Sequence, residues 1–137
     1  MDFINQYFIE AKNIIDKIDR TQISKMVSII HELRSNKGRM FILGVGGGAG
    51  HASHAVNDFR TLFGISAYTP TDNVSELTAR VNDDGWETAS LNWFKIRQLN
   101  KDDMLFVCSV GGGHLAKNIS VNIIKSHELA KQLGSKI

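Results

Sequence analysis

The chain of 137 residues has little cysteine, little proline and no long apolar run. Its one cysteine, Cys108, excludes a disulfide within the chain and a zinc site built from several cysteines. No apolar run approaches the roughly 18 residues of a membrane-spanning helix. The first residues include Asp2 and no basic stretch, unlike a secretory signal. We therefore expect a cytoplasmic protein with no membrane partner.

An excess of charge is also missing. The 16 basic and 14 acidic residues give a formal charge of +2, which is too balanced to favour a nucleic-acid partner. Hydrophobic residues make up 42% and charged residues 22%, as in ordinary globular proteins. Because a domain usually has about 100–200 residues, the sequence predicts a single domain over residues 1–137.

The first 36 residues have the pattern of a helical pair. Apolar residues recur at steps of three and four over residues 3–18, which predicts a helix. A second helix is expected after Thr21, ending near Gly38. The apolar face of the first helix is wide and rich in aromatic and branched residues, so we expect it to be buried against another helix or subunit.

Residues 39–137 alternate between strand and helix patterns. Short apolar runs at 40–43, 65–68 and 104–108 predict strands. Helices are expected over 50–63, from Asn73 or Ser75 to a break at 82–85, over 86–99 and over 114–133. This alternation predicts an α/β fold, a three-layer sandwich with a parallel sheet flanked by helices. Residues 135–137 resemble the start of a further strand, so we expect a truncated chain or a layer supplied by a partner.

Two glycine-rich turns each follow a predicted strand, at residues 44–50 and 111–113. Glycine lets backbone N–H groups approach a ligand, and a helix N-terminus adds partial positive charge, so phosphate is the expected ligand. Residues 44–49 also match the dinucleotide pattern G-x-G-x-x-A, but the acidic residue expected about 20 positions later is missing. A purely structural role in close packing of strand and helix is the other alternative.

The helix after the first turn carries His51, His54, Asp58 and Thr61 on one stripe. The His54–Asp58 spacing suits general acid–base chemistry, or a metal site completed by a third ligand from elsewhere. A solvated polar face is the alternative. Asp83, before Gly85, forms either a simple turn or part of the binding crevice.

Three segments together resemble the sugar isomerase (SIS) domain, in its phosphoheptose isomerase branch. They are GRMFILGVGGGAGHASHAVNDF, TPTDNVSELTARVNDDGWE and KDDMLFVCSVGGGHLAKN. The resemblance runs along the whole chain and implies a flavodoxin-like topology, a phosphorylated-sugar ligand and homotetramers, or at least dimers, that assemble through the N-terminal helices. It also implies zinc near the catalytic residues in some members.

The resemblance assigns roles to individual residues. The family's glutamate base falls on Asp58 and its helix histidine on His54, which together are also the implied metal ligands. Substrate contacts are implied for both turns and for one aspartate: Gly46, Gly47, Gly48, Asp83, Ser109, Gly111, Gly112 and Gly113. The family's Asn and Ser in the first turn are replaced by Val45 and Gly48. A histidine and a glutamine on C-terminal helices of the family have no counterpart in this chain.

These residues lead to three functional hypotheses. The first is an aldose–ketose isomerase acting on sedoheptulose 7-phosphate in bacterial lipopolysaccharide biosynthesis. The second is a non-catalytic sugar-phosphate-binding module with a regulatory or partner-binding role, which the lost hydroxyl groups favour. A third reading, an assembly adaptor, has little support from the charge balance.

Overall fold

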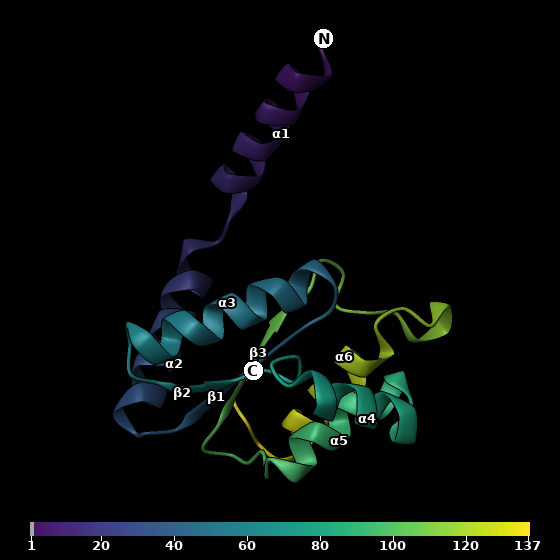
Figure 1. Ribbon diagram of the computed structural model, residues 1–137. Helices are drawn as coiled ribbons and strands as arrows, with labels where there is room; N and C mark the ends of the chain where they lie inside the picture. Colours follow the sequence, from purple (N-terminus) through teal and green to yellow (C-terminus); the bar gives the residue numbers. More distant parts are fainter. Residues whose placement is uncertain (1) are drawn as a thin grey trace. The chain divides into compact units, whose positions relative to one another are not determined.

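The computed structural model describes residues 2–137 and divides the chain into two compact units, one ending at His31 and one from Glu32 to Ile137. The first unit contains α1 (Phe3–Lys17) and most of α2 (Arg20–Ser35), as shown in Figure 1. Asp2 caps α1 by accepting a hydrogen bond from the Ile4 N–H. The boundary between the two units falls inside α2, whereas the sequence predicted a helical pair over 1–36. The prediction of a single domain over residues 1–137 stays a prediction.

The second unit is the α/β part of the chain. Its three strands are β1 (Arg39–Gly44), β2 (Ser66–Tyr68) and β3 (Met104–Cys108). All pair in parallel, in the order β2-β1-β3. The helices are α3 (Gly47–Thr61), α4 (Val74–Asp84), α5 (Trp86–Ile96) and α6 (Val121–Gln132), with a short 3₁₀ turn, η1 (Leu115–Lys117). The predicted flavodoxin-like α/β class is confirmed.

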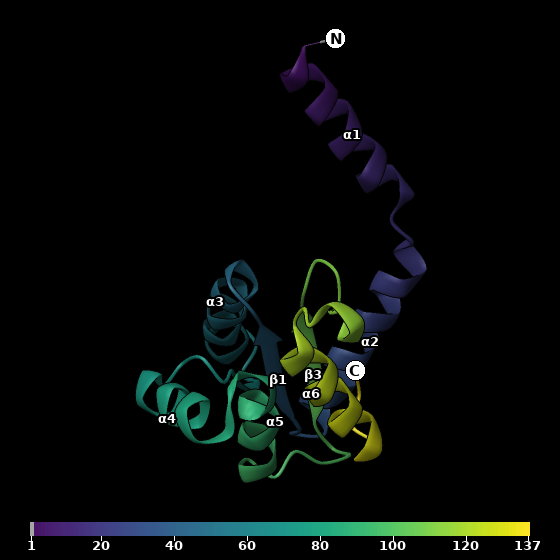
Figure 2. The same ribbon diagram turned by 90° about the vertical axis from the view of Figure 1, so that its right-hand side faces the viewer.

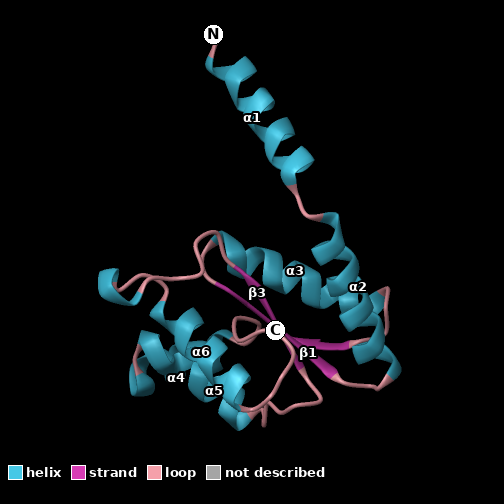
Figure 3. Cartoon of the chain, turned by 180° about the vertical axis from the view of Figure 1, so that it is seen from behind, coloured by secondary structure: helices cyan, strands magenta, loops and turns pink. Residues whose placement is uncertain are grey.

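The sheet lies between two helical layers. Figures 1 and 3 show α3 on one side of the strands and α4, α5 and α6 on the other. Phe41 and Leu43 of β1 are buried in a cluster with Trp93 and Phe94 of α5 and with apolar residues of α6. The intervening β1 residues point to the opposite face, so β1 is buried on both sides, as its continuous apolar run predicts.

An ion pair joins the amino ends of β1 and β3. Arg39 donates two hydrogen bonds to the Asp103 carboxylate, from Nε at 2.9 Å and from Nη2 at 2.7 Å. Asp103 is 2% exposed, and the Asn100 N–H also donates to it. The hydrogen bond to Asp103 raises the pKa of Arg39. This fork geometry fixes both strands at the edge opposite the glycine turns.

Two sequence predictions about the C-terminal region have different outcomes. The single helix over 114–133 is wrong: η1 is followed by Asn118 and Ser120 in left-handed conformations, and α6 begins only at Val121. The predicted start of a strand at 135–137 is confirmed, because Lys136 forms a parallel bridge with Met104 of β3.

Candidate functional site

The two glycine turns lie side by side at the carboxyl edge of the sheet. Since β1 and β3 are parallel neighbours, their following loops emerge at the same edge, as Figure 2 shows. Both loops line one open cleft with a volume of about 670 Å³. Of the residues predicted to bind substrate, four line this cleft: Gly47, Gly48, Ser109 and Gly111. Gly46, Gly112 and Gly113 belong to the same loops but do not line it.

The first loop carries free backbone donors, one of them on Gly47, which lines this cleft. Gly46 precedes α3 with a φ of 58°, a conformation that glycine adopts without strain. Within residues 2–137, the N–H groups of Gly46 and Gly47 have no acceptor in the protein. They stand at the positive end of a 15-residue helix. This loop can therefore bind an anion through its main chain.

Some of the glycines have a packing role instead. A Cβ on Gly48 would lie 2.5 Å from the Cys108 carbonyl oxygen, so the first turn touches the backbone of β3. A Cβ on Gly113 would lie 2.8 Å from the Ile124 side chain and 2.9 Å from the Ser120 carbonyl oxygen. The close-packing alternative thus applies to these two positions. A Cβ on Gly47 or Gly111 would meet no atom within 4 Å, which leaves room beside the backbone for a ligand.

The second loop differs from the expected strand–turn–helix. The Ser109 hydroxyl accepts a hydrogen bond from the Gly112 N–H at 3.0 Å, which closes the turn on itself. The α6 N-terminus is reached only after η1, yet Ser120 and Ile123 still line the cleft. A second helix N-terminus therefore borders the cleft, although it comes later in the chain than the sequence predicted.

The predicted acid–base pair forms on α3. The His54 Nε2 atom lies 3.3 Å from Asp58 Oδ2, one helical turn apart. Asp58 is partly buried, whereas His54 is 79% exposed. Both line a second open groove, of about 600 Å³, together with Gly47, His51 and Cys108, which also line the glycine cleft. Proton-transfer groups and backbone anion donors are thus adjacent.

Asp83 lies elsewhere. It is an exposed residue near the end of α4 and accepts a hydrogen bond from the Asn82 side chain at 2.9 Å. It lines neither the glycine cleft nor the groove beside Asp58. A substrate contact at Asp83 stays a prediction.

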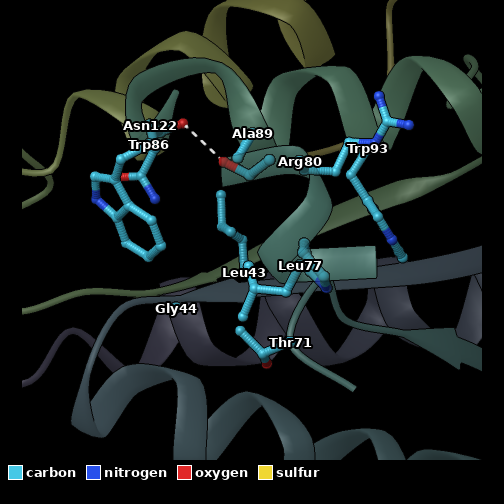
Figure 4. A pocket seen from close by; sticks show the side chains of 11 residues that line it. Leu43, Gly44, Thr71, Leu77, Arg80, Trp86, Ala89, Trp93 and Asn122 are labelled. Carbon is cyan, nitrogen blue, oxygen red and sulfur yellow. Dashed lines mark hydrogen bonds between the residues drawn. The ribbon is translucent and has the colours of Figure 1, made fainter. Parts of the chain in front are cut away.

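No pattern in the sequence indicates a small cavity that lies on the other side of β1. Figure 4 shows its lining, which includes Leu43, Thr71, Trp86 and two polar residues, Arg80 and Asn122. Arg80 Nε and Asn122 Oδ1 are buried without a hydrogen-bond partner. The accessible space is about 20 Å³, enough for one water molecule. The cavity is lined by residues of β1, α4, α5 and α6, which are far apart in the sequence, so no local pattern predicts it.

Comparison with known proteins decides the family. No family model matches the chain. The phosphoheptose isomerase of Helicobacter pylori strain P12 is 31% identical over 144 residues, a match that covers 98% of this chain and 71% of the relative. The chain belongs to the phosphoheptose isomerase family. A second Helicobacter pylori phosphoheptose isomerase, from strain HPAG1, is 29% identical over 143 residues.

Solved structures agree on the fold of this phosphoheptose isomerase family member. The phosphoheptose isomerases of Neisseria gonorrhoeae and Francisella tularensis superpose with TM-scores of 0.81 and 0.82, each at 24% identity. The matches cover 96% and 97% of this chain, and 69% and 70% of the two neighbours. The likeness is therefore spread over almost the whole chain rather than confined to the glycine turns.

The zinc that the resemblance implies has too few ligands here. His54 and Asp58 supply two donors, whereas catalytic zinc sites use three protein ligands. Within residues 2–137, no group of three or more His, Cys, Asp or Glu side chains is placed to hold a metal ion. The pair alone does not fit a zinc site, and zinc binding stays a prediction. Among the same residues, no helix is both long and apolar enough to cross a membrane.

Proposed function

We propose that this family member is a phosphosugar aldose–ketose isomerase that interconverts sedoheptulose 7-phosphate and a glycero-manno-heptose 7-phosphate in heptose biosynthesis. The main support is the juxtaposition of two sites. The cleft between the glycine turns continues into the groove of His54 and Asp58 through shared residues. A phosphorylated sugar needs both an anion site and a proton-transfer group. In this proposal the enzyme works on phosphorylated intermediates in the cytoplasm.

The proposed chemistry uses the side chains of α3. The phosphoryl group binds to the free N–H groups of the first turn. The Asp58 carboxylate removes a proton from the carbon beside the carbonyl, and the C–H electron pair forms the C1–C2 double bond of an enediolate. Asp58 then returns the proton to the other carbon. His54, 3.3 Å from the carboxylate, orients it and moves the proton between the two sugar oxygens.

The test is an isomerisation assay with sedoheptulose 7-phosphate. Asp58→Asn keeps the size and polarity of the side chain but removes its basicity, so we expect turnover to fall about 10²–10⁴-fold while binding persists. Asp16→Asn, on α1 and remote from both clefts in sequence, is the matched control. Equal turnover of Asp58→Asn and wild type would remove Asp58 from the mechanism.

A binding module without catalysis is the second candidate. Val45 and Val110 line the cleft or its rim where hydroxyl or amide groups would bind sugar more strongly, and Ser109 uses its hydroxyl within the loop. Calorimetry beside the assay separates the two functions. Saturable binding of the sugar phosphate without any turnover would support the binding module and refute the isomerase.

We also propose that the chain forms a homo-oligomer, a tetramer or a dimer, through its N-terminal helices. The described α1 has no buried residue, and it exposes a series of large apolar side chains: Phe3, Ile4, Tyr7, Phe8, Ile14 and Ile15. Such a surface is unfavourable in water and typical of an interface between subunits. Light scattering measures the mass. A monomer at micromolar concentration would contradict the proposal, and Phe8→Glu should dissociate the assembly.

A further inference from the structure

The glycine cleft contains no permanent positive charge. Among the described residues 2–137, neither lysine nor arginine lines it, and the titratable groups in its lining are His51 and Cys108. Its backbone N–H groups and helix ends provide only partial charges, equivalent to about half an elementary charge per helix. A phosphoryl dianion would therefore remain under-compensated in the cleft unless a side chain contributed a full charge.

His51 is placed to contribute that charge. It lies one helical turn after Gly47, so the two residues share a face of α3. Both line the glycine cleft, and both line the adjacent groove. Histidine titrates close to neutral pH, so a nearby dianion can draw a proton onto the imidazole from solvent.

The surrounding charges favour His51 over the other histidine of the helix. His54 is already within 3.3 Å of the Asp58 carboxylate and lines only the outer groove. Facing His51 from β3 is the Cys108 thiol, whose pKa is raised by burial, so this group stays neutral at physiological pH. Ser109 and Ser120, from the two ends of the second loop, bring no charge.

We propose that His51 binds the phosphoryl group of the ligand as an imidazolium, and that the protein takes up a proton when the ligand binds. This inference rests on the proposed function only for the nature of the ligand, a phosphorylated sugar. It gives His51 a role that neither its spacing nor the resemblance assigned. Binding should therefore weaken as pH rises from about 7 to 9, where a phosphate monoester stays dianionic because its second pKa lies near 6.

The experiment is calorimetry of the full chain with two probes, sulfate and sedoheptulose 7-phosphate. Sulfate does not titrate in this range, so any proton uptake with it belongs to the protein. Titrations near pH 7.5 in buffers of different ionisation enthalpy give the number of protons taken up. His51→Gln removes the titration but keeps a hydrogen-bond donor, while His127→Gln, on the exposed face of α6, is the matched control. Cys108→Ser tests the other titratable group.

We expect wild type, His127→Gln and Cys108→Ser to take up a fraction of a proton per bound anion. His51→Gln should take up none, lose the pH dependence and bind about tenfold more weakly near pH 7, because a charge-assisted hydrogen bond is replaced by a neutral one. Unchanged proton uptake in His51→Gln would overturn the inference, as would the absence of binding by wild type. Proton-linked binding without turnover would support His51 while refuting the isomerase.

Discussion

Replacing Gly48 by alanine should push the first glycine turn away from the end of β3 and thereby test whether this close contact creates the site. The Cβ of the new residue would lie 2.5 Å from the carbonyl oxygen of Cys108, which belongs to the β3 backbone and cannot rotate away. Relief to ordinary van der Waals contact requires the first turn and β3 to move apart by roughly 1 Å.

The expected effect has a structural and a functional part. Overpacking of this size typically costs about 1–3 kcal/mol of unfolding free energy. A displacement of about 1 Å in a catalytic site can cost about 10²-fold in rate, so turnover should fall more than the loss of stability explains. Chemical denaturation measures the first quantity, and the sedoheptulose 7-phosphate assay measures the second under conditions where the variant is fully folded.

Gly50→Ala is the matched control, two residues further along the same helix. A Cβ there would meet no atom within 4 Å. Because alanine favours helix over glycine, this variant should gain up to about 1 kcal/mol of stability. If Gly48→Ala were as stable and as active as Gly50→Ala, the close approach of the first turn to β3 would be irrelevant to folding and function, and the reasoning would be refuted.

Three further predictions concern charge. Arg39→Met should lose about 3–5 kcal/mol of unfolding free energy in denaturant titrations, because it leaves the Asp103 carboxylate buried without its cationic partner. The double variant Arg39→Met with Asp103→Leu should recover most of this loss. No recovery in the double variant would contradict this account. Burial raises the pKa of the Cys108 thiol above the ordinary value of 9.0. The stability that the folded state gains from keeping this thiol neutral is therefore present below pH 9.0 and is lost as the pH rises through the raised pKa. The rate of Cys108 alkylation by iodoacetamide should accordingly rise with pH with a midpoint above 9.0, and a midpoint below 9.0 would contradict the effect of burial. A bound sugar phosphate should slow the alkylation, because Cys108 lines the cleft. Asp19, just before α2, accepts hydrogen bonds from the Thr21 hydroxyl and N–H, and these bonds lower its pKa below 3.8. The stability that they contribute is therefore present above pH 3.8 and is lost as the pH falls through the lowered value. Carboxyl chemical shifts followed by NMR measure this pKa, and a value at or above 3.8 would refute the prediction.

Local patterns in the sequence account for most of the second unit. The run at 40–43 is continuous and apolar because β1 is buried on both faces, and the run at 104–108 forms a strand that is buried at its start and half-buried at its end. Both strands were predicted within one residue of their observed ends. The pairing of His54 with Asp58 follows from helical spacing alone. These features depend on neighbours within a few positions, which is the information that a pattern contains.

The segment after the second glycine turn could not be predicted in the same way. Leu115 and Ile119 have helical spacing, but Asn118 and Ser120 adopt positive φ values of 52° and 48° and end the 3₁₀ turn. His114 and Ile119 form an antiparallel bridge across this irregular segment. The buried Arg80 Nε, which has no hydrogen-bond partner, was likewise beyond prediction, because its environment is set by elements about 40 positions away.

The ion pair between Arg39 and Asp103 separates the demands of folding from those of ligand recognition. It anchors the two central strands at one end, while every candidate ligand contact in the glycine turns lies at the other. Substitutions in the turns, such as Val45 where the resemblance implies asparagine, are therefore expected to leave the strand register unchanged. A scaffold organised in this way can change its sugar preference over evolutionary time while its architecture stays constant.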